Sequence, residues 1–350
     1  MNPPAYTRIC QKFGVKKENG CYPASLREAL ALKEMFPVEE AFARRKCAAG
    51  SAGETSGKPE NAENEQIQSE IVDKNVSGTV DCGKNVFNIE HLKFQYLENV
   101  PVLQDVNLTI DNRPTAIVGQ NGAGKTTLVK LLKGLLKPIS GNIYYGGDDI
   151  AQKTVAMLAG EIGYVFQNPD DQIFNQTVAS EISYMPKYYK WPQTEIEKSV
   201  REVARFLKIE EFLDKNPFEI PYVTRKFVTI AAILVTKPDF IILDEPTAGQ
   251  DLRGIRILSE LLDYLEERQI GVITITHDME FVADNFQRVI AMANKKIIAD
   301  RTAREIFSDD EILQKSKIKR TQIGSIAEEL GLGKDILNAR EFVERLKEPK

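Results

Sequence analysis

The sequence of 350 residues lacks an excess of positive charge and any long hydrophobic run. Its net charge is −5, and a nucleic-acid backbone is bound by a basic face, so composition argues against nucleic acid as the main partner; a local basic patch stays open. No apolar run approaches the roughly 20 residues of a membrane span. The N-terminus has no basic segment followed by an apolar core, so no secretion signal is expected.

Cysteine is scarce as well, and its positions are uneven. The four cysteines are Cys10, Cys21, Cys47 and Cys82, all before residue 86. Their spacing matches no zinc or redox motif. We interpret them as reduced thiols of a cytosolic protein, with a disulfide among them as the alternative.

The hydrophobic content of 42% is ample for a folded core, but it is unevenly distributed. Residues 1–44 contain a capping-box signature at Ser25–Glu28 ahead of apolar residues, which predicts a small helical segment. Residues 45–85 are poor in large apolar side chains and are predicted to be a flexible linker. The hydrophobic pattern of residues 86–297 predicts one domain, and that of residues 298–350 predicts a helical extension.

A short internal similarity suggests where the first segment comes from. Ile326–Leu332 resembles Ile9–Val15, and Asn338–Glu341 resembles Ser25–Glu28. The stronger interpretation is that residues 1–44 are the tail of a preceding copy of the same module. A chance similarity between short helices is the alternative.

Hydrophobic patterns predict the elements of the main domain. Residues 92–96 and 106–110 alternate apolar with polar, which indicates half-buried antiparallel strands, whereas 162–166, 240–243 and 271–275 read as buried strands. Residues 194–212 have helical spacing and belong to a predicted helical insert of about 175–235. Beyond residue 298 the candidate helix caps are Thr302, Ser308 and Ser325, each followed three residues later by Glu.

The most informative stretch follows an apolar strand at 115–118 and precedes helical spacing at 128–135. It matches the pattern G-x-x-x-x-G-K-[ST], in which glycines let backbone N–H groups point at phosphate oxygens, Lys125 reaches the phosphates and Thr126 binds Mg²⁺. A chance glycine turn before a helix is the alternative. The predicted nucleotide-binding residues here are Gly119, Gln120, Asn121, Gly122, Ala123, Gly124, Lys125, Thr126 and Thr127.

Three further side chains follow predicted strands. Asp244 and Glu245 end the run at 240–243, where a carboxylate beside a phosphate loop can hold Mg²⁺ and a second can orient water. An isolated Asp-Glu pair is otherwise a solvated strand end. His277 follows the strand at 271–275, and we favour a functional role for it and a structural role for His91.

Taken in order, these motifs resemble the nucleotide-binding domain of ABC ATPases across about residues 86–297. The resemblance implies an α/β P-loop fold with a RecA-like core, an antiparallel β subdomain and a helical subdomain. It implies that Tyr96 stacks on adenine and that Gln167 senses Mg²⁺. It also implies that Glu245 is the catalytic carboxylate, that His277 contacts the γ-phosphate and that Asp251 lies in the loop crossing to a second subunit.

Two features resemble the ATPases of energy-coupling-factor (ECF) transporters in particular. The first is NPDDQIF at 168–174, where Asp170 and Asp171 would face arginines of a transmembrane coupling subunit; such an Asp–Arg pair suits a joint that carries force. The alternative is an acidic helix start stabilised by its dipole. The second is the helical extension at 298–350. Tandem members join two such modules by a linker, as residues 1–85 suggest.

One motif of the family is degenerate. The segment Ile220–Thr224 stands where ABC ATPases carry LSGGQ, so both glycines and the serine are missing. Those residues bring backbone donors to the partner's γ-phosphate, whereas Pro221 has no N–H and Tyr222 would block the approach. The site that this chain would complete for a partner is therefore in doubt, but its own site is not.

The sequence thus predicts an ATPase subunit of an ECF-type importer that binds ATP and Mg²⁺ at the cytoplasmic face of the membrane. Its expected partners are a transmembrane coupling subunit, a substrate-binding membrane subunit and a second ABC module with an intact signature, not nucleic acid. The imported molecule, such as a vitamin or a metal ion, is not named by the sequence. A soluble ABC ATPase acting on ribosomes or DNA and a weakly catalytic regulatory module are the alternatives.

Overall fold

The computed structural model describes residues 86–347. The predictions for residues 1–85, the helical segment, the linker and the cysteines, lie outside this range. In residues 86–347 no helix has the length and apolar character needed to cross a bilayer.

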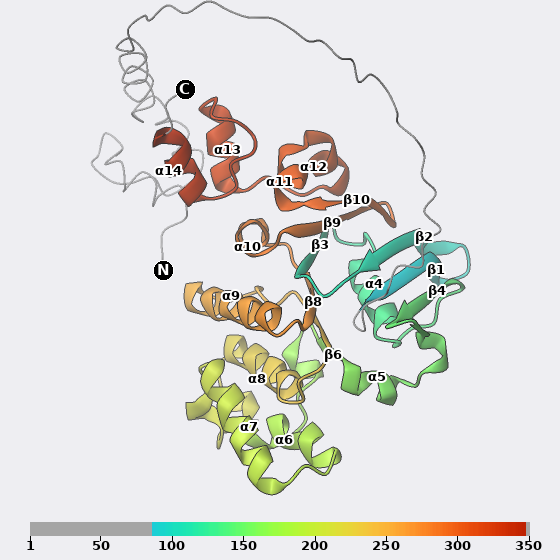
Figure 1. Cartoon of the computed structure of the whole chain (residues 1–350), viewed down its shortest axis with the longest axis vertical. Helices are drawn as coiled ribbons and strands as arrows, with labels where there is room; N and C mark the ends of the chain where they lie inside the picture. Colours follow the sequence, from blue (N-terminus) through green and yellow to red (C-terminus); the bar gives the residue numbers. More distant parts are fainter. Residues whose placement is uncertain (1–85, 348–350) are drawn as a thin grey trace, which may run out of the picture.

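A mostly parallel sheet forms the centre of the molecule (Figure 1). Its strands β3, β8, β7 and β6 are parallel neighbours, β3 also pairs in parallel with β9, and β10 adds an antiparallel edge. In sheet order the strands are β10 (Lys296–Thr302), β9 (Arg288–Ala293), β3 (Thr115–Gly119), β8 (Gly271–Ile275), β7 (Phe240–Asp244) and β6 (Ile162–Val165).

The predicted antiparallel strands form a second sheet beside the first. Its order is β2 (Val100–Ile110), β1 (Phe87–Leu97), β4 (Ser140–Tyr145) and β5 (Asp148–Asp149). Buried residues such as Phe87, Ile89 and Leu92 lie on β1. The half-buried character read from the sequence is therefore confirmed.

Each central strand contributes to two hydrophobic cores because successive side chains point to opposite faces of a sheet. On β3, Ile117 packs with the antiparallel sheet and the helix α4 (Lys125–Leu132), whereas Ala116 and Val118 pack with the opposite core. On β7, Ile242 and Ile241 divide in the same way. The strands that lead to the site are thus buried on both sides, which fixes the positions of the loops at their ends.

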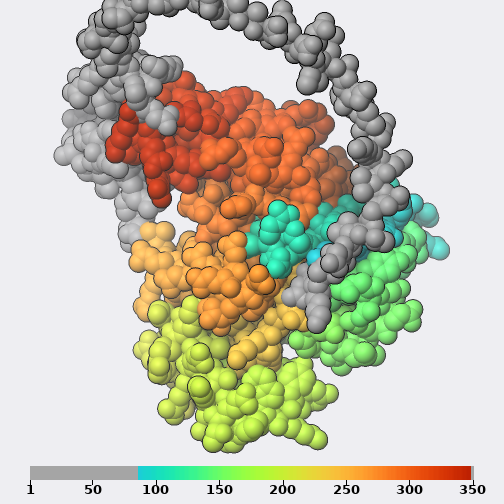
Figure 2. Space-filling model, in the orientation of Figure 1, coloured from blue at the N-terminus to red at the C-terminus, as the bar shows by residue number. Residues whose placement is uncertain are grey.

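Three helices form a subdomain at the end of the molecule opposite the C-terminal helices, as Figure 2 also shows. These helices lie within the range expected for the helical insert, about 175–235, but the amphipathic helix is shorter than the expected 194–212. After α7 the backbone of Lys208 is left-handed, with φ 58°, and a 3₁₀ turn follows at Glu210–Phe212; a left-handed residue is a common helix terminator. The helices are α6 (Val178–Tyr188), α7 (Gln193–Phe206) and α8 (Tyr222–Leu234).

The remaining helices flank the central sheet or follow it. Near the sheet lie α5 (Val155–Glu161), α9 (Leu252–Glu267) and α10 (Met279–Asn285). The C-terminal extension contains α11 (Ala303–Ser308), α12 (Asp310–Ser316), α13 (Gln322–Glu329) and α14 (Ala339–Lys347). Short 3₁₀ helices lie at Ile150–Gln152, Pro169–Asp171 and Pro217–Glu219.

The start of the extension differs from the sequence prediction in two respects. The boundary placed between residues 297 and 298 falls inside β10, which pairs with β9 through a two-residue turn. Asn294 and Lys295 both have positive φ there, as such hairpin turns require. The tail is therefore helical only after Thr302.

Of the three predicted caps, only Thr302 is confirmed, in a capping box with Glu305. The prediction for Ser308 is wrong, because the adjacent Asp309 accepts the N–H groups at the start of α12. The prediction for Ser325 is also wrong: Thr321 caps α13, and the Ser325 hydroxyl donates to the Thr321 carbonyl inside that helix.

The extension contacts the loops of the central sheet at two points. The main-chain N–H of Gln120, in the glycine loop, donates to the carbonyl of Ser316 at 2.9 Å. The N–H of Gln322 donates to the carboxylate of Glu280 on α10 at 2.6 Å. The C-terminal helices are therefore hydrogen-bonded to the segments that follow β3 and β8.

Candidate functional site

The predicted site residues converge at one edge of the central sheet. The glycine loop follows β3, His277 follows β8, Asp244 ends β7 with Glu245 directly after it, and Gln167 follows β6. The carboxyl ends of parallel strands share an edge, which is the usual position for a ligand in such sheets. The fold therefore places four separate motifs around one volume.

The glycine loop has backbone geometry that a larger residue could not adopt. Gly119 has φ 144°, and a Cβ there would lie 2.1 Å from the carbonyl oxygen of Met292. Gly124 has φ 102° and precedes α4 as its N-cap residue. The N–H groups of Gln120 and Ala123 are taken by Ser316 and Gln120 carbonyls, so the donors for phosphate have to come from other residues of the loop.

Lys125 lies inside this loop and is largely buried. Its ammonium donates to the carbonyls of Gly119 and Gln120, at 2.6 and 3.1 Å, and lies 3.4 Å from Nε2 of His277. Burial lowers its pKa, and the carboxylates of Glu245 and Asp244 oppose that effect. The cation is thus held at the centre of the loop, where it can exchange carbonyl oxygens for phosphate oxygens.

We expect Lys125→Ala to weaken ATP binding, because it removes the charge that the loop holds for phosphate. Titration of the full-length chain with ATP measures the dissociation constant. We expect the ATP affinity to fall by at least about 10-fold, which corresponds to the loss of one charge-assisted hydrogen bond. The matched control is Lys137→Ala, an exposed lysine beyond the end of α4. Equal affinities of the two variants would contradict the assignment of Lys125.

Asp244 is buried at the end of β7 and incompletely satisfied. Tyr164 donates its hydroxyl to Oδ2 at 3.0 Å, but Oδ1 has no hydrogen-bond partner among the described residues. Burial raises the pKa of Asp244, and the hydroxyls of Tyr164 and Thr126 partly offset this. An unsatisfied buried carboxylate oxygen beside a threonine hydroxyl is a suitable place for a small, oxygen-preferring cation.

Glu245 and His277 form the second pair in the site. The His277 main-chain N–H donates to Oε2 of Glu245 at 3.2 Å, and Nε2 of His277 lies 3.2 Å from Oε1. Burial raises the pKa of Glu245 and lowers the pKa of His277, in each case by disfavouring the charged form. The backbone of Glu245 is left-handed, with φ 50°. That conformation is unusual for a non-glycine residue and directs its carboxylate toward His277.

These side chains line a cavity of about 650 Å³ that is large enough for a nucleotide. Tyr96 closes one side: the residue is 57% exposed, and its hydroxyl lies 3.3 Å from the Thr127 hydroxyl. Of the predicted site residues, Gly119, Gln120, Ala123 and Asp244 are not among those that line this cavity. Those that line it are Tyr96, Asn121, Gly122, Gly124, Lys125, Thr126, Thr127, Gln167, Glu245 and His277.

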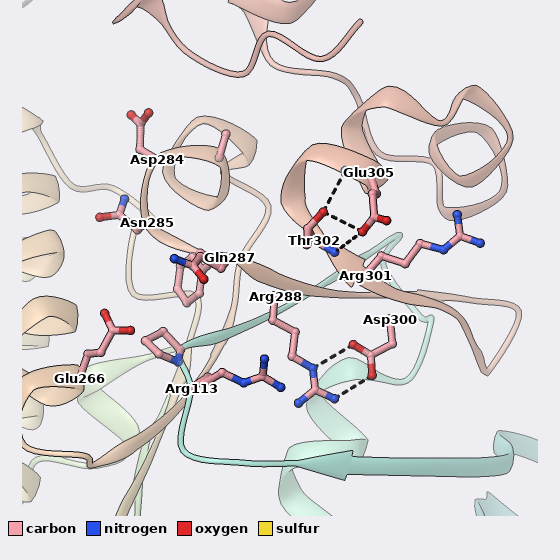
Figure 3. A pocket seen from close by; sticks show the side chains of 13 residues that line it. Arg113, Glu266, Asp284, Asn285, Gln287, Arg288, Asp300, Arg301, Thr302 and Glu305 are labelled. Atoms are coloured by element: carbon pink, nitrogen blue, oxygen red, sulfur yellow. Dashed lines mark hydrogen bonds and ion pairs between the residues drawn. The ribbon is translucent and has the colours of Figure 1, made fainter. Parts of the chain in front are cut away.

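A second crevice, of about 710 Å³, lies away from these motifs (Figure 3). Several of its charged groups have partners: Arg288 pairs with Asp300 through two hydrogen bonds, and Glu305 is part of the Thr302 cap. Arg288 also donates to the carbonyl of Thr109 on β2. These contacts join β2, β9 and β10, so we interpret the crevice as a structural junction despite its larger volume.

The degenerate signature segment, Ile220–Thr224, lies at the start of α8. Pro221 is the N-cap residue and Tyr222 begins the helix with 44% of its surface exposed. Arg225, one turn on, donates to the carbonyls of Ile220 and Phe218 and to both carboxylate oxygens of Asp170, at 2.9 and 3.1 Å. The expected role of Asp170 is therefore modified, because its carboxylate already has an arginine partner within the chain.

Sequence reasoning missed several residues of the site. Tyr164 binds Asp244 from β6, and Lys226 on α8 donates to the main-chain oxygen of Glu245. Val102, Ala248 and Ile275 complete the cavity wall. Asp251, expected in a loop that crosses to a second subunit, is the N-cap residue of α9 and accepts from the N–H of Gly254.

A phosphate loop, two carboxylates at the end of a parallel strand and a histidine after the neighbouring strand define a P-loop ATPase. The family model described as ABC transporter matches residues 103–248. The energy-coupling factor transporter ATP-binding protein EcfA2 of Ligilactobacillus salivarius is 38% identical over 250 residues, which are 68% of this chain and 86% of that protein. The chain therefore belongs to the ABC transporter family, in its group of ECF ATPases.

Other comparisons agree on the same family. EcfA of Methanocaldococcus jannaschii, also an energy-coupling factor transporter ATP-binding protein, is 34% identical over 69% of this chain and 88% of its own length. Among solved structures, CbiO1 of Clostridium perfringens, described as part of the ABC transporter complex CbiONQ, is 33% identical with a TM-score of 0.61. The match covers 70% of this chain and 99% of CbiO1. The predicted ABC-type fold is thus confirmed, and the chain is an ATPase.

Proposed function

We propose that this chain is the ATP-hydrolysing subunit of an ECF-type importer, bound at the cytoplasmic face of a membrane. The observation that carries the proposal is the convergence of Lys125, Glu245 and His277 at the carboxyl ends of three parallel strands. The names of the relatives support a transport role. The imported substrate, a small molecule such as a vitamin or a metal ion, would be selected by a separate membrane subunit.

In this proposal each site residue has a distinct task. The loop at 119–127 and Lys125 bind the phosphates, and Tyr96 stacks on the adenine. Glu245 orients and deprotonates the attacking water. His277, held beside Glu245, contacts the γ-phosphate, and Gln167 reports the state of the site to the membrane partner.

The residues present fit a Mg²⁺ ion as the cofactor. In residues 86–347 no group of three or more His, Cys, Asp or Glu side chains is placed to hold a metal alone. Mg²⁺ in phosphate-transfer sites is usually held by one or two protein oxygens together with substrate phosphates and water. Thr126, Asp244 and Gln167 would supply those oxygens, and the ion would neutralise charge on the phosphates.

Two kinds of partner are proposed. Asp171, which is exposed and follows Gln167 by four residues, is the clearer docking residue for an arginine of a transmembrane coupling subunit, because Asp170 is paired with Arg225. A second ABC module with an intact LSGGQ segment would complete the ATP site of this chain. The alternative function, a soluble ABC ATPase acting on ribosomes or DNA, is expected to keep that segment and to carry basic insertions.

The membrane role is tested by co-purification of the full-length chain from membranes. We expect a transmembrane subunit and an LSGGQ-containing ATPase to co-purify, and Asp171→Ala to reduce recovery of the transmembrane subunit without changing ATP affinity. Asp171→Ala leaves the Asp170–Arg225 pair intact, whereas the double replacement of Asp170 and Asp171 tests both carboxylates. The control is Glu202→Ala, an exposed acidic residue on α7.

Two results would overturn parts of this proposal. Recovery of the chain only with ribosomes or DNA would favour the alternative function. Wild-type recovery of the transmembrane subunit with both Asp170 and Asp171 replaced would exclude the docking role of these carboxylates.

A further inference from the structure

Lys226 is a buried cation that none of the nucleotide-binding motifs includes. It lies in the first turns of α8, one residue after Arg225, and is only 3% exposed. Its ammonium donates to the main-chain oxygen of Glu245 at 2.7 Å. The start of the signature helix is thus bonded directly to the residue assigned as the catalytic carboxylate.

The position of this lysine is energetically costly. Burial lowers the pKa of Lys226, and only the nearby carboxylates of Glu245 and Asp244 oppose that effect. An apolar side chain of similar length would pack in the same place without desolvating a charge. Packing alone therefore does not account for a lysine here, whereas the short hydrogen bond to Glu245 does.

Glu245 is the residue that needs such a contact. Its left-handed backbone, with φ 50°, is unfavourable for a side chain with a Cβ and persists only where surrounding contacts hold it. The Glu245 N–H donates to the carbonyl of Ile275 at 2.8 Å. On the other side of the residue, its carbonyl accepts from Lys226 and, at 3.3 Å, from the N–H of Ala248.

We propose that Lys226 is a positioning residue for ATP hydrolysis, which holds the backbone of Glu245 in the conformation that directs its carboxylate to His277. This inference rests on the proposed role of Glu245. The backbone is fixed by β8 through its N–H and by α8 through its carbonyl, so the carboxylate is aimed by two elements that are separate in sequence. Loss of the Lys226 contact leaves the Ala248 bond, which is longer and lies within the same turn.

The test is single-turnover hydrolysis of [γ-³²P]ATP, with Mg²⁺, by the heteromeric complex that contains the full-length chain and a second module with an intact LSGGQ segment. We expect Lys226→Met to lower the hydrolysis rate constant by about 10- to 100-fold, the cost of a reacting group displaced by a fraction of an ångström to about 1 Å. ATP affinity and thermal stability should stay near wild type. Lys226→Gln keeps an N–H donor without the charge and should retain most of the rate.

A second buried lysine provides the matched control. Lys133 is 7% exposed and its ammonium also donates to main-chain carbonyls, those of Leu158 and Ile162, away from Glu245. Lys133→Met removes a buried charge in the same way and should leave the hydrolysis rate constant unchanged. A rate loss shared equally by the two Met variants would overturn the inference, because it would reflect general destabilisation.

The remaining outcomes separate this inference from the proposed function. Slow hydrolysis by Glu245→Gln with a wild-type rate for Lys226→Met would overturn only the role of Lys226. Wild-type hydrolysis by Glu245→Gln would instead overturn the assignment of Glu245 itself. A Lys226→Gln variant as slow as Lys226→Met would show that an N–H donor from residue 226 to the Glu245 carbonyl is not what the hydrolysis rate requires.

Discussion

Glu245→Gln should retain ATP binding and lower turnover in the assembled complex by roughly 10²- to 10⁴-fold, the usual contribution of a positioned general base. The amide has nearly the same shape as the carboxylate and can still accept the His277 N–H, now seen at 3.2 Å. It cannot take a proton from water. Affinity should therefore change little while the chemical step slows.

The measurement is steady-state ATPase activity beside an ATP titration of the same preparation. Glu260→Gln, the same change at an exposed position on α9, is the control and should turn over like wild type. A Glu245→Gln complex as active as this control would remove Glu245 from the catalytic step. A parallel loss of affinity would point instead to a disturbed phosphate loop.

The purified chain alone should hydrolyse ATP very slowly, and a second module with an intact LSGGQ segment should restore one competent site. In a homodimer each phosphate loop would face Ile220–Thr224, where Pro221 offers no N–H and Tyr222 stands exposed at the helix start. Loss of one oxyanion-type donor costs about 10²- to 10³-fold in rate. The heteromeric complex should therefore exceed the isolated chain by at least that factor.

The comparison uses steady-state rates of the isolated chain and of the complex at equal concentrations of phosphate loops. A complex containing Lys125→Ala in this chain serves as the control, since it keeps the partner but removes the site in question. Brisk turnover by the isolated chain, at a rate that the complex does not exceed, would mean that Ile220–Thr224 works as a signature.

The parts of the fold and site that could be predicted from sequence are those with strong local patterns. The glycine loop needs positive φ at fixed positions, and the strands before Asp244 and His277 are largely apolar, so the sequence alone predicts both features. β10 was missed because its exposed face is polar and its hairpin turn depends on left-handed Asn294 and Lys295. Two-residue turns of that kind are commonest with glycine.

The remaining contacts depend on residues that are far apart in the chain. Tyr164 meets Asp244 across 80 positions, and Arg225 meets Asp170 across 55. Neither Tyr164 nor Arg225 belongs to a recognisable motif. A lysine in the first turns of a helix, such as Lys226, usually faces solvent. The Lys226 side chain reaches Glu245 because of how α8 packs against the central sheet, and no local sequence pattern determines that packing.

The pair formed by Asp170 and Arg225 has a consequence for how a membrane partner would dock. A partner arginine that reached Asp170 would compete with a guanidinium that is already bound through two hydrogen bonds. Docking would then exchange one ion pair for another, and such an exchange contributes little net affinity. Arg225 would keep its bonds to the Ile220 and Phe218 carbonyls. The Asp170 carboxylate would thus pair either with Arg225 or with the partner's arginine. Binding of the membrane partner would then remove one of the contacts that hold Arg225 at the start of α8.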